Sequence, residues 1–307
     1  MMAEIKARKI TYEELFNSTT MFYMNPKYEA EIEKVVQAKT SEISVGLQSI
    51  KDKESLKQYI IDHKDSLDNL TSVAEISVER FKRMVSMIRK DKGFVFQTEW
   101  GLSKIRTAMM DSPAMMESIL NLIWDGKNDE KLQACIPAFY LENMAMDSAT
   151  LNKLKDENSV RQLVKKGLEG KYSNGIGDAV LTDIEKELKR ICAKHGLDYQ
   201  SNVRVSMLDR AVSFVIENPS DPKLILDVSY SVTTSSSQGS KKEAARKTVE
   251  ARRNSGRNFI FVNFLDGAGW IGRQSDMREI HRCSDYVLNL QNLGFLEDII
   301  TEHINEF

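Results

Sequence analysis

The sequence predicts an α/β (α+β) protein, with a helical N-terminal region followed by a mixed sheet flanked by helices. In the first half, apolar residues recur every three or four positions, which is typical of amphipathic helices. In the last third, short apolar runs alternate with turn signals and helical segments, which is typical of strands joined to helices. We therefore expect a helical region at residues 1–150 and a separate domain at residues 175–307.

The N-terminal region is expected to contain several helices joined by short turns. Apolar spacing places them at Tyr28–Gln48, Glu54–His63, Val78–Arg89, Ala114–Trp124 and Lys131–Met144. Methionine is frequent in this region, and we interpret it as part of a Met-rich core. The segment Phe94–Trp100 interrupts the helices and is expected to be a short strand or a loop. Residues 147–177 are expected to form a linker, because they are polar and end in the turn-rich stretch Tyr172–Gly177.

The C-terminal domain is expected to begin with a helix from Asp178 to about Lys194, followed by three successive strands. The strands cover Ser201–Met207, Arg210–Glu217 and Lys223–Tyr230. The tight turn at residues 218–222 predicts that the second and third strands are antiparallel. A capping box at Ser240–Glu243 predicts a basic helix that ends near Gly256. The remaining elements are expected at Asn258–Phe264 (strand), Ser275–Arg282 (helix), Asp285–Leu290 (strand) and Gly294–Ile304 (helix).

Composition narrows the class of protein. The 307 residues carry a net charge of −2, and 41% are hydrophobic, which is ordinary for a soluble globular protein. Residues 240–257 nevertheless hold seven Lys/Arg against two Glu, a local charge of +5 that would suit an anionic partner. No apolar run predicts a membrane span or a signal peptide. Three widely spaced cysteines indicate reduced thiols, so we expect a cytoplasmic protein.

One strand carries the strongest sign of chemistry. Asp227 interrupts the aliphatic run that begins at Lys223, and Ser229 shares its face of the strand. Buried strands rarely place a carboxylate at their exit unless a cation needs it, and a divalent metal beside a phosphodiester is the natural candidate. On the preceding strand, Asp209 and Ser213 are the side chains that a hairpin would bring near Asp227.

The basic helix after this strand adds two cations. A hydroxyl-rich loop leads from the strand to Lys241 and Lys242, which we expect at the helix N-terminus. Two lysines there oppose the helix dipole, which indicates that their charge serves an anion or a nearby acid. The alternative is a pair of solvated lysines in a capping turn. A third reading, a phosphate-binding loop at Gly239–Lys241, lacks the first glycine of the P-loop motif and is disfavoured.

Several stretches together resemble a known nuclease family. They are Gly177–Ala179, Ser213–Glu217, Leu226–Ser229, Gly239–Lys241 with Ala245–Arg246, and Leu265–Trp270 followed by Arg278–Glu279. In this order the chain resembles the PD-(D/E)xK nuclease superfamily, and more specifically type II restriction endonucleases of the DpnII type. The resemblance covers about 120 residues, from roughly 175 to 300, and does not extend to residues 1–150.

The resemblance implies a Mg²⁺-dependent double-strand cut in DNA at a short specific sequence, in a bacterium or archaeon. It implies catalytic roles for Asp227, Ser229, Lys241 and Ser213. Metal ligands would come from Asp227, from Asp209, and from Glu185 or Glu187 on the preceding helix. The chain departs from the pattern in two places, since Ser213 stands where the family has its first Asp and Ser229 stands where the superfamily usually has Lys. Lys241 is expected to supply the positive charge that the usual Lys would give at position 229.

The departure at Ser213 leaves an alternative open, which is a relative that binds DNA without cleaving it. Because cutting both strands usually needs two symmetry-related sites, we expect a homodimer. The helical region is expected to serve DNA recognition, dimerisation or both.

Contacts to DNA are expected from the basic and polar side chains of the C-terminal domain. The candidates are Lys242, Arg246, Arg273, Gln274 and Arg278. The glycines around Trp270 allow two readings. One is a plain turn with Trp270 in the core, and the other is a close approach of the backbone to DNA, which only glycine permits.

Overall fold

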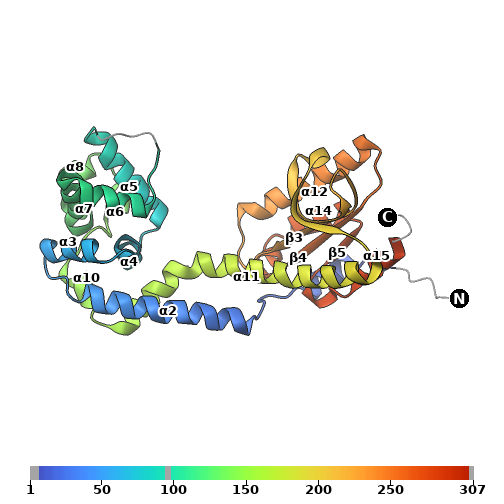
Figure 1. Cartoon of the computed structure of the whole chain (residues 1–307), viewed down its shortest axis with the longest axis horizontal. Helices are drawn as coiled ribbons and strands as arrows, with labels where there is room; N and C mark the ends of the chain where they lie inside the picture. Colours follow the sequence, from blue (N-terminus) through green and yellow to red (C-terminus); the bar gives the residue numbers. More distant parts are fainter. Residues whose placement is uncertain (1–6, 94–97, 304–307) are drawn as a thin grey trace. The chain divides into compact units, whose positions relative to one another are not determined.

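The helices and strands of the chain divide into two structural units. The computed structural model describes residues 7–93 and 98–303 (Figure 1). Glu29–Tyr172 form one unit, here called the helical unit. Met1–Tyr28 and Ser173–Phe307 form the other, here called the sheet unit. Residues 7–28 therefore belong with the C-terminal part of the chain, although they were expected to be part of a helical region at residues 1–150. The expected short strand or loop at Phe94–Trp100 lies largely outside the described residues.

The helical unit is built from helices around a Met-rich apolar core, as the sequence predicted. Buried methionines in this core include Met84, Met109 and Met115. In the described ranges, no helix is long and apolar enough to cross a membrane. The helices are α2 (Pro26–Leu47), α3 (Lys53–Asp62), α4 (Ser66–Val73), α5 (Val78–Asp91), α6 (Leu102–Asp111), α7 (Pro113–Asp125), α8 (Glu130–Gln133), α9 (Ala138–Leu141), α10 (Ser148–Lys153) and the first part of α11 (Glu157–His195).

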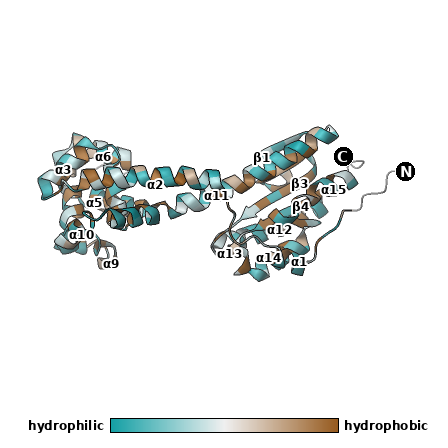
Figure 2. Cartoon of the chain, turned by 90° about the horizontal axis from the view of Figure 1, so that it is seen from below, coloured by the Kyte–Doolittle hydropathy of each residue, from teal (hydrophilic) through white to brown (hydrophobic). Residues whose placement is uncertain are grey.

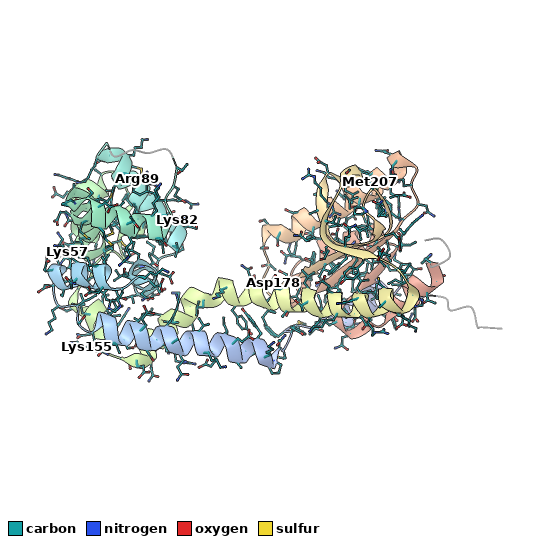
Figure 3. All side chains as sticks on the ribbon, viewed as in Figure 1. Lys57, Lys82, Arg89, Lys155, Asp178 and Met207 are labelled. Atoms are coloured by element: carbon teal, nitrogen blue, oxygen red, sulfur yellow. The ribbon has the colours of Figure 1, made fainter. Side chains whose placement is uncertain are left out.

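Two sequence predictions for this part of the chain are wrong. The helix expected at Lys131–Met144 is split into α8 and α9, because Pro137 cannot donate the backbone hydrogen bond that a continuous helix needs. The expected linker at residues 147–177 instead forms α10 and most of α11, and Asp178 lies inside α11 (Figure 3). Glycine weakens a helix, but a Cβ at Gly175 would lie 2.0 Å from the Tyr28 hydroxyl oxygen, so this glycine permits close packing.

The sheet unit contains a five-stranded mixed sheet in the order β1-β2-β3-β4-β5. The strands are β1 (Tyr199–Val205), β2 (Arg210–Asn218), β3 (Asp221–Tyr230), β4 (Ile260–Asp266) and β5 (Tyr286–Leu288). The first three strands are antiparallel, as predicted for the second and third. β4 and β5 then continue in parallel, because α12 (Ser236–Ser255) and α14 (Gln274–Cys283) cross over between the strands. This mixed sheet between helices is the predicted fold class.

Helices cover both faces of the sheet. Apolar residues line β3 and β4 (Figure 2), and every residue of β4 is buried. On one face, Leu226 and Val262 pack against α11 and α15 (Phe295–His303). On the other face, Ile225 and Phe261 pack against α12 and α14. Because successive side chains of a strand point to opposite faces, each polar side chain of β3 faces one of these two helical layers.

The N-terminal segment belongs to this unit through direct contacts. Leu15, in α1 (Tyr12–Asn17), is fully buried in the core beneath α12 and α14. The side chain of Asp266, at the end of β4, accepts a hydrogen bond from the Thr20 backbone N–H at 2.6 Å. The buried Asn289 donates to the Ser18 hydroxyl at 2.7 Å. These contacts explain why residues 7–28 pack with the sheet.

The basic helix begins earlier than the sequence predicted. α12 begins at Ser236, and its capping box joins Ser235 and Gln238 rather than Ser240 and Glu243. Its C-terminal end agrees with the prediction, because Gly256 adopts a left-handed conformation with φ +65°. Lys241 and Lys242 therefore lie in the second turn, where a positive charge opposes the helix dipole less than it does in the first turn.

An ion-pair network between α11 and α15 predicts how the stability of the protein changes at acidic pH. Arg190 and Lys194 bind Glu297, with Lys194 Nζ at 2.5 Å from Oε1. The Arg190 hydrogen bond, followed by that of Lys194, lowers the pKa of Glu297 to about 2. A depressed pKa means that this stabilisation is present above pH 4.5 and is lost as the pH falls towards 2. Glu297→Gln should therefore reduce the loss of stability between pH 5 and pH 3, measured as the urea midpoint.

The size of this effect should be small, because exposed ion pairs are screened by water and salt. Glu250→Gln is the matched control, since Glu250 is exposed on α12 and forms no ion pair within the described residues. Equal acid dependence in the two variants would contradict the assignment, and 1 M salt should remove the difference between them.

Candidate active site at the fork between two strands

Asp227 is buried and paired with an arginine. Only 5% of Asp227 is exposed, on the sheet face covered by α12 and α14. Arg210 Nη1 donates to Asp227 Oδ1 at 3.2 Å, and Nη2 donates to Oδ2 at 2.6 Å. Arg210 Nη2 also donates to the Thr248 hydroxyl of α12 at 2.7 Å. Both carboxylate oxygens are thus engaged by one guanidinium, a bidentate arrangement that is among the stronger ion pairs in proteins.

The strands β2 and β3 separate beside this ion pair. Their register runs from Asn218 opposite Asp221 to Phe214 opposite Leu226. Beyond it, the Val228 N–H donates to the Ser213 hydroxyl oxygen at 3.0 Å instead of to a backbone carbonyl. Lys241 Nζ donates to the Val228 carbonyl oxygen at 3.3 Å. We call the place where this ladder ends, with Ser213, Asp227–Ser229, Arg210 and Lys241 around it, the fork.

The fork arises because the β1–β2 hairpin curls over α12 (Figure 1). The turn between these strands, Ser206–Leu208, contacts α12. Met207, labelled in Figure 3, lies in this turn and packs against the core beneath α12. Val212 and Val215 pack into that same core, although Phe214 between them packs on the opposite face. The alternation of side chains along β2 therefore shifts at Ser213, and Arg210 turns towards Asp227.

The structure gathers the four residues predicted to be catalytic. Ser213 and Lys241 bind the peptide groups on either side of Val228, and Asp227 and Ser229 flank that residue. Ser229 is half-buried, and its carbonyl oxygen accepts a hydrogen bond from Trp270 Nε1 at 3.1 Å. Arg210 and Thr248 were missed. The sequence feature that could have identified Arg210 is its position on the same strand as Ser213, three residues earlier.

The structure does not bring the predicted metal ligands together. Asp209 ends the turn before β2 in a left-handed conformation, pairs with Arg204, and its side chain is 89% exposed. Glu185 and Glu187 lie on α11, which covers the opposite face of the sheet from Asp227. Glu187 is also paired with Arg190 at 2.6 Å.

As arranged, these residues do not fit a Mg²⁺ ion. Mg²⁺ favours carboxylate oxygens, but Arg210 holds both oxygens of Asp227 and Lys241 binds the Val228 carbonyl oxygen. No group of three or more His, Cys, Asp or Glu able to hold a metal occurs among the residues that the structure describes.

Most of the basic residues predicted to bind DNA have partners within the protein. Lys242 Nζ lies 2.9 Å from Asp276 Oδ1, and Arg273 Nη2 lies 2.6 Å from Oδ2. The Lys242 hydrogen bond holds the pKa of Asp276 below its usual range. Arg246 pairs in the same way with Glu279 at 3.0 Å. Lys242 and Arg246 therefore join α12 to α14, whereas Arg273 pairs within the first turn of α14.

The other two DNA-binding candidates also lie in α14. Arg278 stacks over the Tyr12 ring at 4.4 Å, and Gln274 is exposed at the start of the helix. In contrast to Lys242, Lys241 forms no ion pair with any described residue.

The hydroxyl-rich loop after β3 is held from two sides. The buried Gln238 side chain donates to the Ser231 hydroxyl oxygen at 3.1 Å and to the Thr233 carbonyl oxygen at 3.0 Å. On the other side, a Cβ at Gly269 would lie 2.4 Å from the Thr233 carbonyl oxygen. Trp270 is fully buried, so the plain-turn reading of this segment holds. The close approach that glycine permits here is to the loop itself.

This packing predicts the effect of adding one methyl group. Gly269→Ala should lower the free energy of unfolding by about 1–3 kcal/mol, because the new Cβ meets backbone atoms that cannot rotate away. Urea unfolding measures the change. Gly294→Ala is the matched control, because its Cβ would meet no atom within 4 Å. Equal stability of the two variants would show that the loop is not held by this contact.

A family model matches the part of the chain that contains the sheet and the fork. A family described as the BanI C-terminal domain, a restriction endonuclease domain, matches residues 148–306. The search of curated proteins returned no match. The matched segment covers just over half of the chain and contains the whole fork. The chain therefore belongs to the BanI C-terminal domain family of restriction endonucleases.

Proposed function

We propose that this protein is a type II restriction endonuclease that cuts double-stranded DNA at a short specific sequence. Membership of the BanI C-terminal domain family is the observation that carries the proposal. We further propose that the fork holds the scissile phosphate, and that two copies of the chain act together, since each strand of the duplex needs its own site.

The fork supplies positive charge, which the cleavage of a phosphodiester needs. The transition state gathers negative charge on the phosphate, and fixed cations stabilise it most where water is excluded. Lys241 reaches the fork from α12, and Arg210 reaches it from β2. Lys241 has no acid partner within the described residues, so its charge is available to a phosphate. Asp227 is the only carboxylate among the residues that define the fork. Its place at the fork together with Ser213 makes it our candidate for the residue that orients the reacting groups.

A second candidate function is DNA binding without cleavage, and two observations favour it. Ser213 offers a hydroxyl where the resemblance implies a carboxylate, and Arg210 occupies both oxygens of Asp227. Such a site holds a phosphate through its cations but lacks free carboxylates for metal-assisted hydrolysis. Mg²⁺ dependence is therefore a prediction from the resemblance. Cleavage assays with and without divalent metal distinguish cutting from binding without cutting.

The first test is cleavage of unmethylated phage DNA by the purified protein in Mg²⁺, in Mn²⁺ and in EDTA. We expect discrete fragments whose ends share one short sequence. Asp227→Ala should abolish cutting, and Lys241→Ala should slow it by more than tenfold, about 1.4 kcal/mol in the barrier. Arg204→Ala serves as the control, because Arg204 is exposed on β1 and pairs with Asp209 outside the fork.

The outcomes separate the two candidates. Specific binding with no fragments under any of the three conditions would favour binding without cleavage. Absence of both binding and cutting would refute the proposal, and full activity of Asp227→Ala would remove the fork as the site.

The second test concerns the serine at the fork. Ser213→Asp places a carboxylate next to Asp227 and still offers an oxygen to the Val228 N–H. We expect it to increase the cleavage rate at least tenfold, because two acids at one site are better suited to a hard cation than one acid and a hydroxyl. Ser206→Asp, at an exposed position of the same hairpin, adds the same charge outside the fork. Equal rates for the two variants would show that Ser213 is not the limiting residue.

A further inference from the structure

The helical unit contains a pocket that the fork does not explain. Its volume is about 350 Å³, and it opens between α5 and the segment that leads into α9. A pocket of this size is large enough for one nucleotide-sized ligand. Its lining residues are Arg80, Arg83, Met84, Met87, Cys135, Ile136, Pro137 and Tyr140.

The pocket combines an apolar floor with a cationic rim. Met84 and Ile136 in the floor are each only 3% exposed. Arg80 and Arg83 lie three residues apart on α5, so they share one face of the helix. The Arg80 guanidinium lies 5.2 Å from the centre of the Tyr140 ring, within the range of a cation–π contact.

The charges on this rim are available to a ligand. Lys82 on α5 is engaged by Glu79 at 2.8 Å and by Glu99 at 3.3 Å. In contrast, neither Arg80 nor Arg83 pairs with a carboxylate anywhere in the described ranges. Arg80 and Arg83 lie on α5, the helix that also carries Lys82, which is labelled in Figure 3. The rim is therefore selective for an anionic ligand.

Exposed aromatic rings adjoin the rim. Phe139 is 72% exposed and Tyr140 is 39% exposed, and their ring centres lie 5.8 Å apart. Large exposed apolar side chains at a concave surface mark a binding site. A ligand that uses the whole site must therefore present both a flat apolar face and a negative charge.

We propose that this pocket binds one nucleotide of the DNA whose base has left the helical stack. The base would lie on the apolar floor and against Tyr140, and its phosphate would meet Arg80 and Arg83. A phosphate backbone alone would use the arginines but leave the floor and Tyr140 without a role. The inference rests on the proposed action on DNA and adds a nucleotide-binding role for the helical unit.

The test compares two DNA probes on the full chain. One is a 30-base-pair duplex, and the other is the same duplex with one unpaired base in one strand. The extra base is already free to unstack, so we expect the protein to bind the second probe at least about fivefold more tightly, since stacking on an aromatic side chain favours it by that order. Tyr140→Ala and Arg83→Ala should each abolish this preference, measured as the ratio of the two dissociation constants.

Two controls separate stacking from charge. Arg83→Lys keeps the positive charge but loses the flat guanidinium, so it should lose most of the preference. Lys34→Ala removes one charge from an exposed position of α2 in the same unit and should retain the preference. An unchanged preference in Tyr140→Ala and Arg83→Ala would overturn the proposal.

Cys135 provides a readout that needs no substitution. Its thiol lines the pocket, and burial raises its pKa above the ordinary value, so alkylation by iodoacetamide is followed at alkaline pH. The bulged duplex should slow alkylation of Cys135 more than the intact duplex does. Equal alkylation with both probes, at concentrations where both bind, would overturn the pocket assignment. Failure to bind either duplex would instead refute the proposed action on DNA.

Discussion

The ion pair between Arg210 and Asp227 is the interaction on which the geometry of the fork depends. A buried carboxylate without a partner is costly, and removing one member of a buried pair typically destabilises a protein by about 3–5 kcal/mol. Arg210 satisfies both oxygens of Asp227 and also donates to Thr248 of α12. This pairing stabilises the place where the ladder between β2 and β3 ends. The Val228 peptide then finds its partners in side chains, with Ser213 accepting from its N–H and Lys241 donating to its carbonyl oxygen.

A second buried carboxylate supports the same end of the sheet. Asp266 accepts hydrogen bonds from the backbone N–H groups of Thr20, Gly267 and Leu290. Burial raises its pKa, and the three N–H groups act in the opposite direction. One side chain thus ties the N-terminal segment, the glycine turn and the end of β5 to β4. The loop after β3 packs against that turn at Gly269, so the fork is closely packed on the side away from the β1–β2 hairpin.

The sequence predicted the features that follow from local patterns. The fold class, the antiparallel pairing of β2 with β3 and the burial of Asp227 all follow from the alternation of apolar residues and one tight turn. The long helix α11 was missed because its glycines resemble a hinge. The tertiary contact with Tyr28 explains only Gly175, and Gly170 and Gly177 meet no atom within 4 Å. Arg210 was missed for a related reason. Its route to Asp227 depends on the curl of a hairpin over α12, which no spacing within β2 reveals.

Charge balance at Asp227 constrains how the fork would hold a phosphate under the proposed function. A phosphate that enters between Arg210 and Lys241 competes with Asp227 for the same guanidinium, because both anions prefer bidentate contact with arginine. If Arg210 turned towards the phosphate, Asp227 would be left buried without a countercharge, so that movement requires the arrival of another cation. If Arg210 stays on Asp227, Lys241 alone meets the phosphate and the carboxylate takes no part in chemistry. Under the proposed functions, cutting and binding without cutting would therefore differ in the position of the Arg210 side chain. Ser213 carries no charge, so it does not draw Arg210 or another cation away from Asp227.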